Sequence, residues 1–368
     1  MKKIAVIFTV IIAISCSKEQ VIDTGGTLDD IADKVHAIVL SEDVTQILGE
    51  ISYNSLYCSK HELLLLVNRG SQKILVVDME GELISSFGVE GRGPEELLAT
   101  SNIGMDLECN ILVYDHQNQL VKTFSRHGEL INTYEPVTLG RIWKRGNYIY
   151  HLDNYYYISM EQPGWFNMDM KDISTFVKMD SSFTYFKKYG RIDQYYIKEL
   201  DDMMRHTFMA LDKYSRTIIT THIIIPYFKI FDVDNDYEYV GRFGYQSPNF
   251  LMSDTPMRME HSMEQRMNVA LEKSIVDSPF ITKDYLVFRF YNLTKQGAAD
   301  NDLSKMFFFL SIYDRTNDYE YITEVSIPYH PIAVDSDRNR LFFIDTFEAD
   351  EIVIGVYELR DHITKTRG

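Results

Sequence analysis

The segment GMDLECNILVYDHQNQLVKTFSRHGELINTY, residues 104–134, decides the fold. Its strand-forming runs at 111–115, 120–125 and 129–134 are short and rich in β-branched and aromatic residues. Polar residues typical of turns separate the runs, and Gly128 ends one of these turns. Short apolar runs bounded by such turns predict antiparallel hairpins.

The same pattern recurs along the chain. Hairpin patterns occupy residues 74–87, 176–190, 227–244 and 310–325. Inner strand pairs are predicted at residues 104–115, 208–221 and 332–345. An inner pair and a hairpin make four strands, which is one propeller blade. We therefore predict an all-β fold, a six-bladed β-propeller with four-stranded blades over residues 31–360.

The last repeat lacks a fourth strand in its own stretch of chain. Residues 351–359 form its third strand, and the polar tail at 361–368 has no strand pattern. The run KVHAIVL at residues 34–40 is a strand without a local partner. We expect this N-terminal strand to complete the last blade and close the ring, which removes open sheet edges.

The N-terminus has the pattern of an export signal. Met1-Lys2-Lys3 precedes an apolar run at 4–14 that is too short to span a bilayer, so residues 1–15 are interpreted as a signal peptide. The run ends in Ala13-Ile14-Ser15-Cys16, which resembles a bacterial lipobox. Cys16 is the predicted lipid anchor, and residues 16–30 the predicted flexible tether. A plain secretory signal with an incidental cysteine is the alternative.

One glycine-rich segment extends this interpretation to a family. Phe87-Gly88, Gly91-Arg92-Gly93-Pro94 and the strands that follow resemble an NHL-type propeller repeat. Together with the lipobox and the opening strand, they resemble the six-bladed β-propeller lipoproteins of Bacteroides-type gut bacteria. The resemblance implies lipid anchoring at the outer membrane, on its periplasmic or its surface-exposed face. It transfers no catalytic residue.

Composition narrows the classes of partner. The chain has 368 residues, with 37 basic against 54 acidic side chains and a net charge of −17. This balance argues against a nucleic-acid partner, which requires a basic surface. Cys58 and Cys109 follow the first strands of adjacent repeats. We expect them to stay unpaired, because such positions should lie beyond the limit of about 7 Å between Cα atoms.

Two further segments need an interpretation. Residues 256–274 carry Met259, Met263 and Met267 at four-residue spacing, which predicts a short helical insertion packed over one face. The run DVDND at 232–236 resembles the start of a calcium loop. Tyr237 and Phe243 occupy positions where such a loop needs glycine and an acid, so we interpret the run as a hairpin turn. No metal site and no cofactor is predicted.

Aromatic residues of the third repeat are the candidate ligand-binding residues. Trp143, Tyr156 and Trp165 could stack on a sugar or anchor a peptide, or they could fill the space between blades. We expect a monomeric envelope lipoprotein that acts as a non-enzymatic binding or scaffolding propeller for a protein or glycan partner. The alternative is a propeller lyase or hydrolase acting on carbohydrate or peptide. No catalytic residue is assigned.

Overall fold

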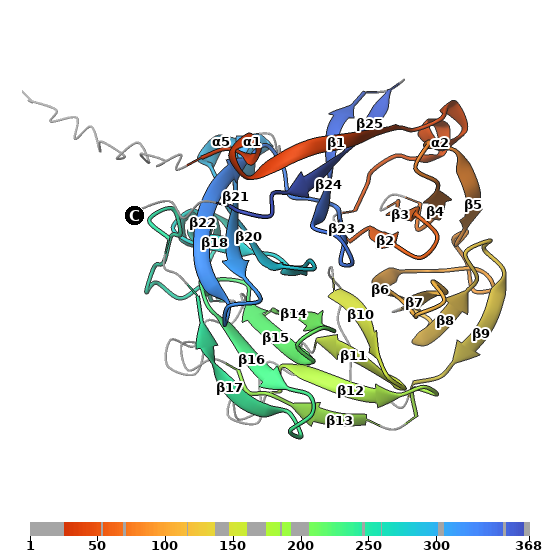
Figure 1. Cartoon of the computed structure of the whole chain (residues 1–368), viewed down its shortest axis with the longest axis horizontal. Helices are drawn as coiled ribbons and strands as arrows, with labels where there is room; N and C mark the ends of the chain where they lie inside the picture. Colours follow the sequence, from red (N-terminus) through yellow and green to blue (C-terminus); the bar gives the residue numbers. More distant parts are fainter. Residues whose placement is uncertain are drawn as a thin grey trace, which may run out of the picture.

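The computed structural model describes residues 26–363, except 53, 69–70, 116, 137–146, 160–173, 185, 193–205, 245–246, 259, 301–304 and 349–350. Its strands surround a common centre in a propeller-like arrangement (Figure 1). Hydrogen bonds between the described strands form five sheets. The predicted all-β class is confirmed.

Four of the sheets are separate blades. The first holds β2 (Leu56–Cys58), β3 (Leu63–Val67), β4 (Ile74–Val77) and β5 (Leu83–Phe87). The next holds β14 (Thr207–Asp212), β15 (Thr217–His222), β16 (Phe228–Asp232) and β17 (Glu238–Phe243). The five-stranded sheet holds β18 (Ser274–Val276), β19 (Phe280–Ile281), β20 (Tyr285–Asn292), β21 (Phe307–Asp314) and β22 (Glu320–Ile327). The last holds β23 (Ala333–Asp335), β24 (Arg340–Phe347), β25 (Ile352–Leu359) and β1 (Ala32–Val39).

The fifth sheet has eight strands, which differs from the expected series of separate four-stranded sheets. It runs through β6 (Thr100–Met105), β7 (Ile111–Asp115), β8 (Leu120–Phe124), β9 (Leu130–Tyr134), β10 (Asn147–Leu152), β11 (Tyr155–Ser159), β12 (Phe176–Asp180) and β13 (Phe186–Tyr189). A parallel pairing of β6 with β10 joins its two halves, and Gly104 lies opposite Ile149. A Cβ atom on Gly104 would lie 2.0 Å from the Ile149 carbonyl oxygen, so only glycine lets the two strands approach this closely.

Aspartates at the ends of strands define many of the turns. Asp78, Asp106, Asp212 and Asp314 each accept hydrogen bonds from backbone N–H groups two to four residues further along the chain. A carboxylate that bonds its own following backbone stabilises a tight turn. The predicted strand–turn–strand units are confirmed at each of these positions.

The ring closes where the N-terminal strand meets the C-terminal one. β1 pairs antiparallel with β25 from Ala32↔Leu359 to Val39↔Val353, which confirms the predicted closure. Arg360 adds a two-pronged ion pair to Asp33, with the shortest contact at 2.7 Å. On the other side, the Ser41 N–H donates to the carbonyl of Gly81 in the β4–β5 turn. We call these contacts, with the β1–β25 ladder, the closing seam.

Residues 26–30, the last part of the predicted tether, lie against the fold. The Gly26 carbonyl accepts a hydrogen bond from the Ser326 N–H, and Thr27 forms a bridge with the same residue. Helix α1 (Leu28–Ile31) then buries Leu28 and Ile31. This segment therefore adds its own apolar contacts to the start of the closing seam.

In the described residues, three further helices lie in connections. They are α2 (Glu42–Ile47), α4 (Met263–Ala270) and α5 (Lys295–Asp300). Helix α4 lies within the predicted helical insertion, and it starts at a capping box formed by Ser262 and Gln265. It buries Val269 and Ala270, whereas Met263 is largely exposed, so the methionine spacing does not define the packed face. Met259 lies outside the described residues.

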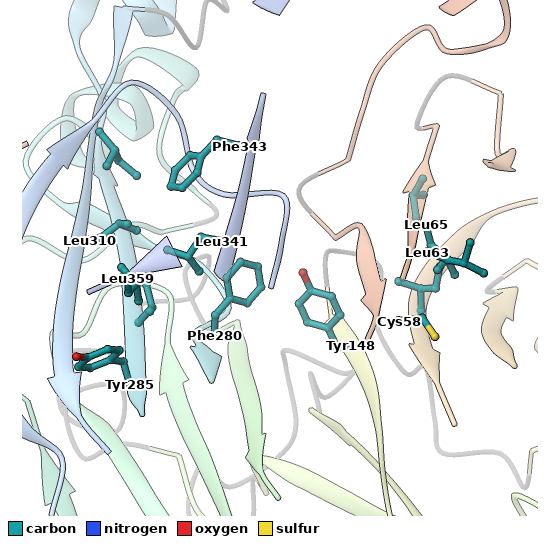
Figure 2. Close-up of a cluster of buried hydrophobic side chains, with 14 of the residues drawn as sticks. Cys58, Leu63, Leu65, Tyr148, Phe280, Tyr285, Leu310, Leu341, Phe343 and Leu359 are labelled. Atoms are coloured by element: carbon teal, nitrogen blue, oxygen red, sulfur yellow. The ribbon is translucent and has the colours of Figure 1, made fainter. Parts of the chain in front are cut away.

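Apolar side chains fill the spaces between neighbouring sheets. Leu64 and Leu75 from one sheet pack with Ile38, Phe342 and Ile354 from the sheet beside it. Another cluster reaches the centre of the ring, where Figure 2 shows Tyr148 and Phe280. Each buried side chain of this size stabilises the fold by roughly 1.5–3 kcal/mol. Packing between sheets, rather than within one sheet, therefore holds the ring together.

Candidate functional site: the mouth of the central channel

The centre of the ring contains a cavity of about 260 Å³. Residues of β2, β6, β10, β14, β19 and β23, or of the turns directly after them, line its wall. All five sheets therefore contribute to one cavity. Its rim consists of turn residues, which we call the channel rim: Ser59, Lys60, Asp106, Leu107, Lys213, Tyr214, Ser336 and Asp337.

A disulfide lies in the cavity wall, which corrects the prediction that the two cysteines stay unpaired. Cys58 and Cys109 are bonded, with their Cα atoms 6.0 Å apart. Cys58 ends β2, and Cys109 lies in the β6–β7 turn with a positive φ of 61°. The first strand of each repeat lies close to the axis of the ring. The backbone at Cys109 also turns away from the direction of a regular strand. Adjacent repeats therefore come closer here than equivalent positions further out.

Side chains of two sheets meet across the rim. Lys213 forms an ion pair with Asp337, and the Tyr214 hydroxyl donates to the Ser336 carbonyl at 2.7 Å and to Asp337 at 3.0 Å. The Tyr214 ring is still 42% exposed. Burial and the hydrogen bond with Asp337 raise the pKa of Tyr214, so its hydroxyl stays protonated. The rim therefore holds a partly open aromatic ring in a fixed position.

A second ion pair lies on another part of the rim. Lys60 Nζ lies 2.5 Å from Glu108 Oε2, and both side chains are well exposed. Asp106 is engaged differently, because its carboxylate accepts the N–H groups of Glu108 and Asn110 and the Asn110 amide. Leu107, 69% exposed, adds an apolar side chain between these polar groups.

Large aromatic side chains close the inner part of the cavity. Tyr148 and Phe280 are almost wholly buried, and their ring centres lie 6.1 Å apart (Figure 2). The Tyr150 hydroxyl donates to the Met209 carbonyl at 2.9 Å. Tyr148 and Tyr150 come from β10 and Phe280 comes from β19 of another sheet, so side chains of two sheets narrow the cavity here.

A buried arginine lies directly behind this aromatic floor. Arg289 is fully buried, and its Cζ atom lies 3.9 Å from the centre of the Phe280 ring. Its guanidinium donates to the carbonyls of Ser278 and Pro331 at 2.7 and 2.8 Å. Asp277 Oδ1 lies 3.6 Å from Arg289 Nη2. A buried charge of this kind requires such partners.

His330 completes the buried cluster. Its Nδ1 lies 3.5 Å from Asp277 Oδ2, and its Nε2 lies 3.1 Å from the Phe290 carbonyl oxygen. Burial alone would raise the pKa of Asp277, but Arg289 and His330 outweigh it and lower that pKa to about 2. Burial lowers the pKa of His330, although Asp277 opposes this. The cluster is therefore held as a charged Asp277–Arg289 pair beside a histidine that resists protonation.

The acidic turn at residues 232–236 is part of the β16–β17 hairpin, as predicted. Asp234 pairs with Arg216, and Asp236 pairs with Lys187, so neighbouring cations occupy these carboxylates.

Within the described residues, no group of three or more histidine, cysteine, aspartate or glutamate side chains has the geometry to hold a metal ion. Among the helices of the described residues, none is long and apolar enough to cross a membrane.

Of the predicted site residues, the structure describes only Tyr156. Cys16, Trp143 and Trp165 lie outside the described residues. Tyr156 stacks on Phe183 with ring centres 4.6 Å apart, and burial raises its pKa to about 12. It also contacts His151, which lines the cavity. Tyr156 thus lies in the layer behind the cavity wall.

The Gly91–Pro94 segment connects β5 to β6, as expected of a link between repeats. The Gly93 N–H donates to Glu96 Oε2 at 2.6 Å, and the buried Lys122 donates to the carbonyls of Gly93 and Glu96. Lys122 thus satisfies loop carbonyls rather than a ligand.

Tyr214 and Arg289 were not predicted from the sequence. Tyr214 follows the β14 strand in the same turn as Asp212, a position that the repeat pattern could have marked as part of the rim. Arg289 stands inside the apolar run YLVFRFYN of β20, and a lone arginine in such a run is a signal of a buried charged partner.

The comparisons with known proteins concern the fold. No protein-family model and no curated protein matches the chain. The similarity lies in solved structures. A member of the DUF4221 family from Bacteroides vulgatus is 13% identical, covers 90% of this chain and 99% of its own, and has a TM-score of 0.65.

A second solved structure is similar to nearly the same extent. A protein from Bacteroides fragilis that is named as exported is 11% identical, covers 91% of this chain and 97% of its own, and has a TM-score of 0.60. A gluconolactonase from Xanthomonas campestris reaches a TM-score of 0.47 at 9% identity, which is too low to support an argument about this chain. Identities this low establish the propeller-like fold alone.

Proposed function

We propose that this protein is a six-bladed propeller lipoprotein of the outer membrane that binds a protein or glycan partner at the channel mouth. Each half of the eight-stranded sheet has four strands in meander order, so we count it as two blades. The proposal rests on one observation, a cavity to which all five sheets contribute strand or turn residues. Concave sites lined by a few convergent polar groups are typical of ligand binding.

The binding site can be tested with matched bulky substitutions. Leu107 is an exposed apolar residue of the channel rim, and Val240 is an exposed apolar residue of the outer strand β17. Leu107→Trp should abolish the thermal shift caused by a bound glycan or peptide, whereas Val240→Trp should leave it unchanged. Equal losses in both variants, or loss only with Val240→Trp, would place the site elsewhere.

The lipid anchor is tested separately. The apolar run that ends at Cys16 motivates the proposal. Intact-mass analysis of membrane-extracted protein should show an acylated N-terminal cysteine, and Cys16→Ser should release the protein from membranes. A Cys16→Ser protein that remains wholly in the membrane fraction contradicts the anchor. We further propose that the protein is a monomer, which sedimentation velocity would check.

A propeller enzyme is the second candidate, and the Asp277–Arg289–His330 cluster is the observation that favours it. The Asp277 side chain is 20% exposed and ionised, and perturbed titratable groups often mark reactive sites. His330 itself is almost fully buried. Cleavage of oligosaccharide or peptide probes, detected by mass spectrometry and lost in Asp277→Asn, would support this candidate. Probes that remain intact would exclude it for those substrates.

A further inference from the structure

The charged side chains of the channel mouth already have partners within the protein. Among the described wall residues, Lys60 is paired with Glu108, and Lys213 is paired with Asp337. Asp106 is occupied by three N–H donors from its own turn. A charged ligand would have to compete with these internal partners. The mouth therefore favours a ligand without net charge.

The same ion pairs can still form hydrogen bonds. An ammonium group has three donors, and a carboxylate has about four acceptor positions, so one ion pair uses only part of this capacity. The paired side chains stay exposed, Lys60 at 48%, Lys213 at 41% and Asp337 at 49%. A hydroxyl group both donates and accepts, so it can bond the two members of a pair at once.

Tyr214 adds an apolar surface beside these pairs. Its hydroxyl is anchored by Ser336 and Asp337, and its ring is 42% exposed on the channel rim. Lys213 Nζ and Arg315 Cζ lie 5.2 and 4.8 Å from the ring centre, so a ligand can stack only on the ring area that these cations leave exposed. A fixed aromatic ring next to paired charges suits the C–H face of a sugar, whose hydroxyls project around its edge. Leu107 extends the apolar surface on the rim.

The floor limits how far a ligand can enter. Tyr148 and Phe280 from two different sheets pack against each other in the cavity wall, with Arg289 over the Phe280 ring, and narrow the space that a ligand can enter. The cavity of about 260 Å³ is also smaller than a site for an extended oligomer. The end of a chain fits this geometry, and a central segment does not.

We propose that the channel mouth binds the terminal sugar of a neutral glycan. Tyr214 is the stacking surface, and the Lys213–Asp337 and Lys60–Glu108 pairs bond the sugar hydroxyls. This inference rests on the proposed binding function, to which it adds the class of ligand. Neutral recognition also predicts an affinity that depends little on salt, because no ion pair forms between protein and ligand.

The test is calorimetric titration of the purified protein with neutral and acidic oligosaccharides. The neutral probes are cellotriose, xylotriose, mannotriose and maltotriose, and the acidic probe is trigalacturonic acid. We expect at least one neutral probe to bind, with an affinity that changes less than about twofold between low and high salt. Tyr214→Ala should weaken it by about tenfold, the scale of a lost aromatic contact. The matched control Tyr239→Ala removes an exposed tyrosine from the outer strand β17 and should have no effect.

The outcomes separate the two proposals. Binding of trigalacturonic acid that is lost in Tyr214→Ala, with no neutral probe bound, overturns the neutral-glycan inference and leaves the binding function standing. Neutral binding that survives Tyr214→Ala overturns both, because the site is then elsewhere. If none of the probes binds, the inference is overturned, and the Leu107→Trp experiment then decides the binding function.

Discussion

The closing seam and the channel rim both join distant parts of the chain, but they do so with different chemistry. The seam is a backbone ladder between β1 and β25, with Ile38 fully buried in it. The rim uses exposed side-chain pairs such as Lys213–Asp337. Backbone ladders with buried side chains carry stability, whereas exposed ion pairs contribute about 0–1 kcal/mol each. The fold thus places its stability at the seam and leaves the rim available for a ligand.

Deleting residues 33–41 should have the largest effect, because it removes β1 and opens the edge of β25. We expect a sharp fall in melting temperature and aggregation, measured by calorimetry and light scattering. The control is deletion of residues 17–25, which stops before the Gly26 contact with Ser326. If both truncated proteins melt alike and remain monomeric, the seam does not hold the ring.

Arg289→Met tests whether the buried Asp277–Arg289 pair contributes to stability, as the closing seam does. The substitution leaves Asp277 without its cation and should cost about 3–5 kcal/mol of unfolding free energy. Chemical denaturation measures this cost. Adding Asp277→Asn should recover part of it, since the uncompensated charge is removed. A single variant as stable as the parent protein would show that the cluster is not a structural element.

Removing the disulfide should cost less stability than deleting β1 and more than breaking an ion pair of the channel rim. Cys58→Ser together with Cys109→Ser should lower the unfolding free energy by about 2–4 kcal/mol, the usual effect of opening a loop of this size. Reductant should lower the melting temperature of the parent protein but not that of the double variant. If reductant also lowers the melting temperature of the double variant, the Cys58–Cys109 bond does not cause that response.

The repeat pattern predicted the strands and their turns, and it predicted the closing seam from an unpartnered run at residues 34–40. The channel was harder to predict, because its residues come from every repeat and no local pattern brings them together. The disulfide was missed since spacing along the chain does not show how closely first strands converge. The β6–β10 pairing depended on the missing side chain of Gly104, a contact made only in three dimensions.

Acidification tests the buried histidine. Because burial keeps the folded-state pKa of His330 below its ordinary value, the unfolded chain binds a proton first as pH falls through about 6.5. The unfolding free energy should therefore decrease from pH 7 to pH 5, by at most about 1.4 kcal/mol per pH unit from this group. His330→Gln should show a shallower decrease. An identical pH profile in both proteins would remove His330 from the explanation.

Breaking one rim pair should have the smallest effect on stability. Lys213→Met should change the unfolding free energy by less than about 1 kcal/mol, because both partners are exposed. Lys187→Met, which breaks a similar exposed pair with Asp236 on an outer strand, should behave the same way. Only Lys213→Met should weaken ligand binding. A large loss of stability in Lys213→Met would make the rim pair structural.

Hydrogen–deuterium exchange with the tightest-binding glycan or peptide tests binding at the channel mouth most directly. We predict slower exchange in the turns after β2, β6, β14 and β23, which carry Lys60, Leu107, Tyr214 and Asp337. Exchange in the outer strands β9 and β17 should not change. Protection of the outer strands with no change in the rim turns would contradict the account.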